Sequence, residues 1–122
     1  MTITDKLLGF ARRTFGTEPE YLWASTPDAA VLRRADNRKW YAVLMPVDRQ
    51  KLGLEGPGAV EVIDLKADPP MVDSLLTRPG FLPAYHMNKV HWFTALLDGT
   101  VPEDELRQLL EYSHACARGK RT

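Results

Sequence analysis

Two apolar runs joined by a short polar turn decide the fold, and they form the stretch Ala29-Ala30-Val31-Leu32-Arg33-Arg34-Ala35-Asp36-Asn37-Arg38-Lys39-Trp40-Tyr41-Ala42-Val43-Leu44-Met45. Short apolar runs bounded by turn residues are typical of buried β-strands. We expect strands over Ala29–Arg34 and Lys39–Met45. The turn between them contains Asp36 and Asn37, which tolerate left-handed backbone angles. The second strand is apolar on both faces, which predicts a central position in the sheet. Its faces are predicted to carry Trp40, Ala42 and Leu44 on one side and Tyr41, Val43 and Met45 on the other.

Amphipathic helices are predicted at both ends of the chain. Apolar residues at helical spacing predict a first helix over Ile3–Thr14, with Thr2 as its N-cap and Gly16 as its C-terminal stop. A last helix is predicted to begin at a capping box formed by Thr100 and Glu103. It is expected to end in a cationic segment closed by a glycine, namely Arg118, Gly119, Lys120 and Arg121.

The middle of the chain predicts the rest of the sheet. We expect a third strand over Ala59–Leu65, a short helix starting at Asp68-Pro69-Pro70, and a fourth strand over about Val90–Leu97. Because only one pair of strands is separated by a helix, the sheet should be largely antiparallel. The sequence therefore predicts an α+β two-layer sandwich in a single domain, residues 1–122, with the N- and C-terminal helices on one face of the sheet.

Composition excludes several classes of function. The chain carries 16 Lys and Arg residues against 16 Asp and Glu residues, so bulk electrostatic attraction to nucleic acid is absent and any such contact needs a local basic patch. No stretch reaches the roughly 18 consecutive apolar residues of a membrane helix, and residues 1–6 do not resemble a signal peptide. We expect a cytoplasmic protein without membrane contact. Cys116 is the only cysteine, which excludes an intrachain disulfide and a Cys-based metal site.

Two segments near the C-terminal third resemble the signature of a known family. They are Tyr85-His86-Met87-Asn88-Lys89-Val90-His91-Trp92 and Leu97-Asp98-Gly99-Thr100-Val101-Pro102. This pattern is similar to that of the MmcQ/YjbR family, which is mostly bacterial. The resemblance implies a fold like that of the frataxin-like CyaY proteins and of double-wing DNA-binding domains, and it implies DNA binding as a function. The chain departs from the family pattern at Ser113-His114, where the family more often has Ser-Tyr.

Iron binding, the other function that a frataxin-like fold suggests, is not expected. Frataxins present a ridge of carboxylates from the first helix and the neighbouring strand, whereas the first helix here offers only Asp5 and the strand after it is basic. Hard cations need clustered oxygen ligands. We predict no metal and no cofactor.

The first predicted hairpin supplies the leading candidate site. Arg33 and Arg34 precede the turn, and Arg38 and Lys39 follow it, which gathers four cations near one tip. Such a tip resembles the wing of a DNA-binding domain, where cations contact phosphates, and Lys89 is a further candidate for binding an anion. The competing interpretation is that charged hairpin ends only discourage aggregation.

The segment His86–Trp92 supplies the alternative site, with His86, Asn88, His91 and Trp92 as its candidate residues. If the strand extends back this far, His86, Asn88 and Trp92 share one face and the two histidines do not converge. One interpretation is a binding strip for a protein or a small ligand. The other is a structural corner in which Asn88 satisfies loop backbone and Trp92 lies in the core.

No catalytic constellation is evident. The candidate nucleophiles Ser25, Ser74, Ser113 and Cys116 lie outside any nucleophile-elbow setting. We therefore predict a small binding protein rather than an enzyme. Its partner is expected to be DNA contacted through the hairpin or, alternatively, a protein or small ligand at His86–Trp92 with no nucleic-acid role.

Overall fold

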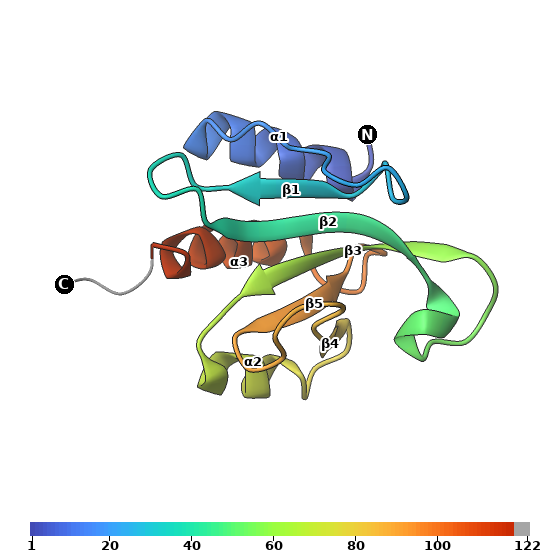
Figure 1. Ribbon diagram of the computed structural model, residues 1–122. Coiled ribbons are helices and arrows are strands. Elements are labelled where there is room, and N and C mark those ends of the chain that lie inside the picture. Colours follow the sequence, from blue (N-terminus) through green and yellow to red (C-terminus); the bar gives the residue numbers. More distant parts are fainter. Residues whose placement is uncertain (119–122) are drawn as a thin grey trace.

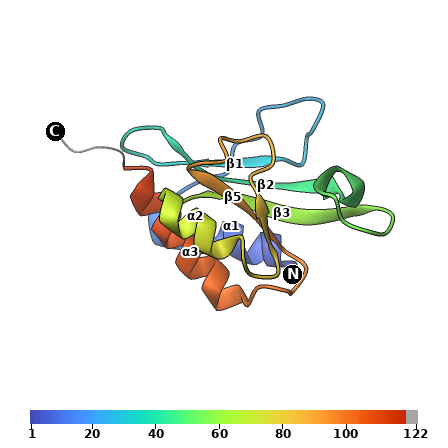
Figure 2. The same ribbon diagram turned by 90° about the horizontal axis from the view of Figure 1, so that it is seen from below.

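Residues 1–118 are described by a computed structural model, in which three helices, one 3-10 turn and five strands follow one another along the chain (Figure 1). Their bounds are α1 (Ile3–Phe15), β1 (Ala30–Arg33), β2 (Trp40–Asp48), η1 (Arg49–Leu52), β3 (Ala59–Lys66), α2 (Pro69–Leu75), β4 (Phe81–Pro83), β5 (Trp92–Leu96) and α3 (Glu103–Cys116). The strands form one antiparallel sheet in the order β1-β2-β3-β5-β4. Figure 2 shows the three helices on one side of this sheet. The predicted α+β architecture and antiparallel sheet are confirmed.

The hydrophobic core lies between the sheet and the helices. Side chains from one face of the sheet meet the apolar faces of α1 and α3, and the fully buried members are Leu7, Ala11, Leu32, Tyr41, Ala42, Ile63, Leu65, Phe93, Ala95, Leu106, Leu110 and Ala117. Full burial of a Leu, Ile or Phe side chain contributes about 1.5–3 kcal/mol. The opposite face of the sheet is covered by loops in the described part of the chain, and Figure 2 shows them on the side away from the helices.

The capping residues predicted at the N-termini of the two long helices are present in one helix and absent in the other. The Thr2 side chain accepts from the Asp5 backbone N–H and the Asp5 carboxylate accepts from the Thr2 N–H, so the predicted cap of α1 is present. The capping box predicted for α3 is wrong. Its N-cap is Pro102, whose side chain makes no capping hydrogen bond. The Thr100 hydroxyl donates to the Asp98 carboxylate and does not cap the helix. Glu103 is engaged by Arg107 at 2.9 Å. The predicted end of this helix at Gly119, Lys120 and Arg121 lies outside the described residues.

A β-bulge in β2 changes which side chains face the helices. Leu32 pairs with Ala42 but Arg33 pairs with Trp40, so Tyr41 is an extra residue on β2. A bulge of this kind turns two successive side chains to the same side of a sheet. Tyr41 and Ala42 accordingly both lie in the helix-side core. The prediction that they point to opposite faces, with Trp40 beside Ala42, is wrong at this position, because pattern alone does not reveal an unpaired residue. The predicted central position of the strand is confirmed, since β2 lies between β1 and β3.

A buried serine on α3 completes the hydrogen bonding at this bulge. The Ser113 hydroxyl donates to the Tyr41 carbonyl at 2.5 Å and accepts from the Lys66 backbone N–H at 2.8 Å. These two backbone groups lie beyond the last paired residues of β2 and β3, where Ala42 faces Leu65. Ser113 is fully buried. It therefore ties the helix layer to the sheet through polar contacts within an apolar core.

The region before the last strand differs from the prediction. β5 begins at Trp92 rather than at Val90, and part of the predicted linker, Phe81–Pro83, forms the edge strand β4. Among residues 1–118, no helix is both long and apolar enough to cross a bilayer.

Candidate functional site

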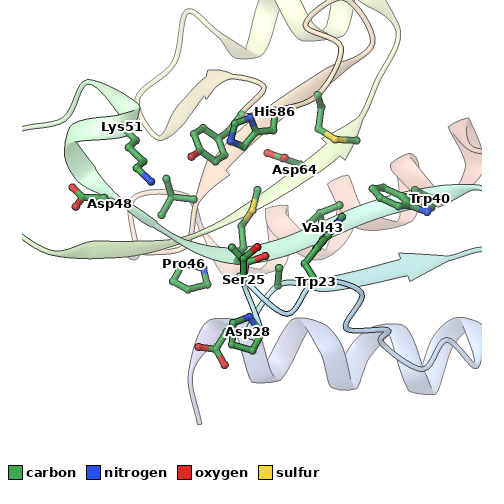
Figure 3. A pocket seen from close by; sticks show the side chains of 17 residues that line it. Trp23, Ser25, Asp28, Trp40, Val43, Pro46, Asp48, Lys51, Asp64 and His86 are labelled. Atoms are coloured by element: carbon green, nitrogen blue, oxygen red, sulfur yellow. The ribbon is translucent and has the colours of Figure 1, made fainter.

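A cavity of about 730 Å³ opens on the face of the sheet that the helices leave uncovered (Figure 3). Its floor comes from β2 and β3, and its walls come from residues 23–29, from the start of the β2–β3 connection, and from residues 85–87. The lining combines aromatic, thioether and aliphatic groups with a few polar ones. The lining side chains include Trp23, Trp40, Val43, Met45, Asp64 and His86.

Strand alternation in β3 places a carboxyl group in the floor of this cavity. Ile63 and Leu65 face the helices, so Asp64 between them faces the other way. Asp64 pairs across the sheet with Val43 on β2 and Thr94 on β5. Figure 3 shows the Asp64 carboxyl among the side chains of the cavity. Asp64 is nevertheless fully buried, with 0% of its surface exposed.

One oxygen of this carboxyl is held by the protein and the other is not. The Thr94 hydroxyl donates to Asp64 Oδ1 in a short hydrogen bond, and Thr94 Oγ1 itself accepts from the Tyr85 backbone N–H at 2.9 Å. Asp64 Oδ2 has no hydrogen-bond partner among residues 1–118. Buried polar atoms are nearly always paired, and an unpaired one calls for an explanation.

Burial raises the pKa of Asp64 to about 7, since the charged carboxylate loses its hydration inside the sheet. The Thr94 hydrogen bond, the Tyr85 N–H and the positive charge of Lys89 oppose this shift without cancelling it. At neutral pH the group is therefore present in both forms, and it can accept a hydrogen bond or donate one. Strongly perturbed acids in clefts are typical of functional sites.

Aromatic rings form the walls above Asp64. The rings of Trp23 and Trp40 meet edge to face, with their centroids 5.7 Å apart. Trp23 is 38% exposed and belongs to residues 21–28, all of which are exposed. On the other side, the rings of Tyr85 and His86 lie 4.0 Å apart. Large exposed aromatic side chains around a concave site favour contact with a flat molecule.

His86 adopts a left-handed backbone conformation, with φ at 62°. Non-glycine residues with such angles are uncommon, although His is among those enriched there, and they gather at ligand-binding sites. This conformation also ends any strand-like extension of β5 toward His86. The condition for a shared face of His86, Asn88 and Trp92, a strand that extends back to His86, is therefore not met, since β5 begins at Trp92.

The rest of the predicted strip lies elsewhere. Asn88, His91 and Trp92 line a separate cavity of about 430 Å³ together with Lys66 and Cys116. Asn88 Oδ1 accepts from the backbone N–H groups of Val90 and His91, at 2.8 and 3.1 Å. Trp92 is buried, and Lys66 Nζ lies 5.5 Å from the centroid of its ring. These contacts favour the structural-corner interpretation for Asn88 and Trp92, whereas Lys89 and His91 are exposed.

Three of the four predicted hairpin cations are engaged in ion pairs. Glu20 pairs with Arg33 at 3.3 Å and with Arg38 at 2.9 Å. Arg34 pairs with Asp36 at 2.8 Å, and its side chain is only 12% exposed. Lys39 is exposed and makes no ion pair with any other described residue.

The tip of this hairpin holds the carboxyl end of α3. Arg34 donates to the backbone carbonyl of His114 at 2.6 Å, and Asn37 Nδ2 donates to that of Ala117 at 3.0 Å. Terminal carbonyls of a helix need such donors, and a cation there also complements the helix dipole. The left-handed residue of the turn is Arg38 rather than Asp36 or Asn37. Arg34 and Asn37 therefore have a structural role in this chain.

The departure from the family pattern, His114, lies in the same region. Its ring stacks on Phe15 with a centroid separation of 3.8 Å and meets Tyr41 edge to face at 4.8 Å. Burial, followed by the charge of Arg34, lowers the pKa of His114. This position is packed among aromatic rings on the helix side of the sheet, away from the cavity that Asp64 occupies.

Sequence reasoning did not find Asp64, although the signal is present in Val62-Ile63-Asp64-Leu65, where an acid interrupts a short apolar run. Trp23 and Thr94 were also missed as site residues, because their proximity depends on how distant segments fold over the sheet. Within residues 1–118, no group of three or more His, Cys, Asp or Glu side chains is placed to hold a metal ion.

Comparison with known proteins gives consistent matches over most of the chain. A family model described as YjbR matches residues 13–116. The chain is 38% identical over 113 residues to "Uncharacterized protein YyaQ" of Bacillus subtilis (strain 168), covering 93% of this chain and 96% of that protein. A crystal structure of a protein from Pseudomonas syringae has 44% identity and a TM-score of 0.90, covering 93% of this chain and 97% of that one. The crystal structure of Deinococcus radiodurans protein DR2400 has 27% identity and a TM-score of 0.71, covering 93% and 77%.

Proposed function

This chain belongs to the YjbR family, and we propose that it is a binding protein that holds a small ring-containing ligand in the cavity above Asp64. The observation that carries the proposal is the fully buried Asp64 carboxyl, one oxygen of which lacks a partner among the described residues, in the floor of an open cavity. Ligand sites in proteins are mostly apolar concavities of about 300–1,000 Å³ with a few placed polar groups. The cavity, at about 730 Å³, has this size and character.

Stability alone does not account for a carboxyl at this position. A buried acid without full hydrogen bonding costs free energy, and an apolar side chain of similar size would pack on this sheet face without that cost. Neighbouring Val43 shows that the face accepts such a residue, since it pairs directly with Asp64 and is 3% exposed. A ligand that donates to Oδ2 would supply the missing partner.

Indole, as a neutral planar probe, tests this proposal. At millimolar concentration it is expected to shift the indole N–H signals of Trp23 and Trp40 in the NMR spectrum while leaving that of Trp92 in place. Binding in the millimolar range corresponds to about −4 kcal/mol. Met45→Trp, which fills the cavity from β2, should remove the shifts, whereas Val90→Trp, at an exposed position outside the cavity lining, should not. Unchanged Trp23 and Trp40 signals with indole and with other ring compounds would count against a ligand site here.

DNA binding has less support from the geometry. Arg33, Arg34 and Arg38 are already paired with two carboxylates, Glu20 and Asp36, which leaves one positive charge in excess, and Arg34 is needed at the end of α3. Phosphate contact would require breaking these pairs, since affinity for DNA rises with the number of free cations. A protein-binding role for the exposed segment around Trp23 would use the same aromatic side chains as the ligand.

A mobility-shift assay separates the two functions. At about 0.15 M salt, we expect no DNA complex that both weakens with added salt and requires Arg38 and Lys39. The double variant Arg38→Ala/Lys39→Ala is the informative one, because Arg34→Ala would also disturb the helix that Arg34 holds. A complex that forms with the wild-type protein, weakens steeply with salt and is lost in this variant would restore DNA as the partner, and Lys89→Ala would then map the patch.

A further inference from the structure

The cavity presents one isolated acceptor against aromatic walls. Thr94 occupies Asp64 Oδ1, and the Tyr85 N–H fixes the orientation of that threonine hydroxyl. The position of the carboxyl is therefore set by the sheet and does not depend on a ligand. Oδ2 remains without a partner among residues 1–118, and neighbouring atoms cover it, so a ligand reaches it by displacing one of the side chains that line the cavity.

The charges around the cavity favour a positive or hydrogen-donating partner. The charged lining residues are Asp28, Asp48, Asp64 and Lys51. The charge of Lys89 also acts on Asp64, so three carboxyl groups face two ammonium groups. An anionic ligand such as a carboxylate or phosphate would meet this excess of negative charge at close range. A cation or an N–H donor would be attracted by it.

The shape and composition of the walls add a second requirement. Trp23 and Trp40 lie on one side of the cavity and the paired rings of Tyr85 and His86 contribute on another. A flat ring fits against such surfaces through stacking and edge contacts, and a ring cation gains a further cation–π attraction. A flexible aliphatic amine would be attracted by the negative charge but would not stack against these rings.

We infer that the ligand is a planar nitrogen base, whose N–H or protonated nitrogen edge bonds to Asp64 Oδ2 while its ring packs against Trp23 and Trp40. This inference rests on the proposed function and specifies its ligand class. The acid and a ring nitrogen base share one proton in either arrangement: the carboxylate accepts from a protonated base, or the carboxylic acid donates to a neutral base. Amidine-bearing rings and amino-substituted heteroaromatic rings carry this chemistry.

Three isosteric probes test the ligand class, namely benzamidine, benzamide and benzoate, titrated at pH 7.5 and followed through the Trp23 and Trp40 indole signals. They share ring size and planarity and differ in charge. Hydrogen bonds to charged groups are the stronger ones, so benzamidine should bind at least tenfold more tightly than benzamide, and benzoate should bind least. In Asp64→Asn the preference for benzamidine over benzamide should fall to about twofold or less.

The variant Trp23→Leu serves as the comparison, since it removes a wall but not the acceptor. It should weaken the binding of benzamidine and of benzamide by similar factors and leave the ratio of their affinities unchanged. Equal binding of all three probes to the wild-type protein, or a preference that survives in Asp64→Asn, would overturn the ligand class while leaving the cavity as a binding site. A complete absence of shifts with all three probes would overturn the proposed function itself.

Discussion

At pH 8, the Asp64→Asn variant is expected to be more stable than the wild-type protein by roughly 4 kcal/mol in free energy of unfolding. The folded protein holds the pKa of Asp64 at about 7, against 3.8 for an ordinary aspartate. Each unit of such a difference corresponds to about 1.4 kcal/mol. The neutral amide retains the shape of the side chain and can still accept from Thr94. It avoids the burial of a negative charge.

The sign of the effect follows from counting protons. Between about pH 4 and pH 7, the unfolded chain has lost the Asp64 proton and the folded protein still holds it, so the unfolded state binds fewer protons. The free energy of unfolding contributed by this group then falls by about 1.4 kcal/mol per pH unit as pH rises, and it levels off above pH 7. Near pH 4 the two proteins should therefore be about equally stable.

Urea denaturation of both proteins from pH 4 to pH 8 measures this difference, because contributions from all other groups are common to the two and cancel. The control is Asp73→Asn, which changes an exposed carboxylate on α2 and should alter stability by no more than about 0.5 kcal/mol. Parallel curves for wild type and Asp64→Asn across this range would mean that Asp64 ionises normally in the folded protein and that its burial carries no energetic cost.

The Ser113→Ala variant is expected to lose about 2–4 kcal/mol of stability. The substitution removes one oxygen and leaves the Tyr41 carbonyl and the Lys66 N–H without their shared partner. Each buried polar group left unpaired costs about 1–3 kcal/mol. The loss should appear as a lower urea midpoint with an unchanged m-value, since the surface exposed on unfolding stays the same.

Ser74→Ala is the matched control, because Ser74 is an exposed serine on α2. It should change the free energy of unfolding by less than about 0.5 kcal/mol. If Ser113→Ala proves equally mild, water or a shift of α3 must satisfy the two backbone groups, and the bulge would not depend on the serine.

The sequence predicted the parts of this fold that depend on local patterns. The capped first helix, the central apolar strand and the antiparallel α+β arrangement follow from spacing and turn residues, and the structure confirms them. The Tyr41 bulge was not predictable in this way, because it exists only in the register between β1 and β2. The start of the last strand was also misplaced, since the Asn88 side chain binds two backbone N–H groups that a strand would have used.

The candidate site was less accessible to sequence reasoning. His86 was identified from its position in a family-like segment, and it does line the main cavity. Asp64 and Trp23 were not identified, since they are 41 residues apart in the numbering and meet only when residues 23–29 fold over the sheet. The hairpin cations were correctly placed near one tip. Their pairing with Glu20 and with the end of α3 depends on contacts across the fold that composition does not reveal.

The bond between Arg34 and the His114 carbonyl joins positions 80 residues apart. On a ribosome, the hairpin emerges long before the segment that it must hold, and no earlier part of the chain offers those carbonyls. The polar groups of its tip therefore stay hydrated in the nascent chain until α3 has been synthesised. The final packing of the hairpin thus follows the synthesis of α3, and a chain that stops short of α3 leaves the hairpin undocked.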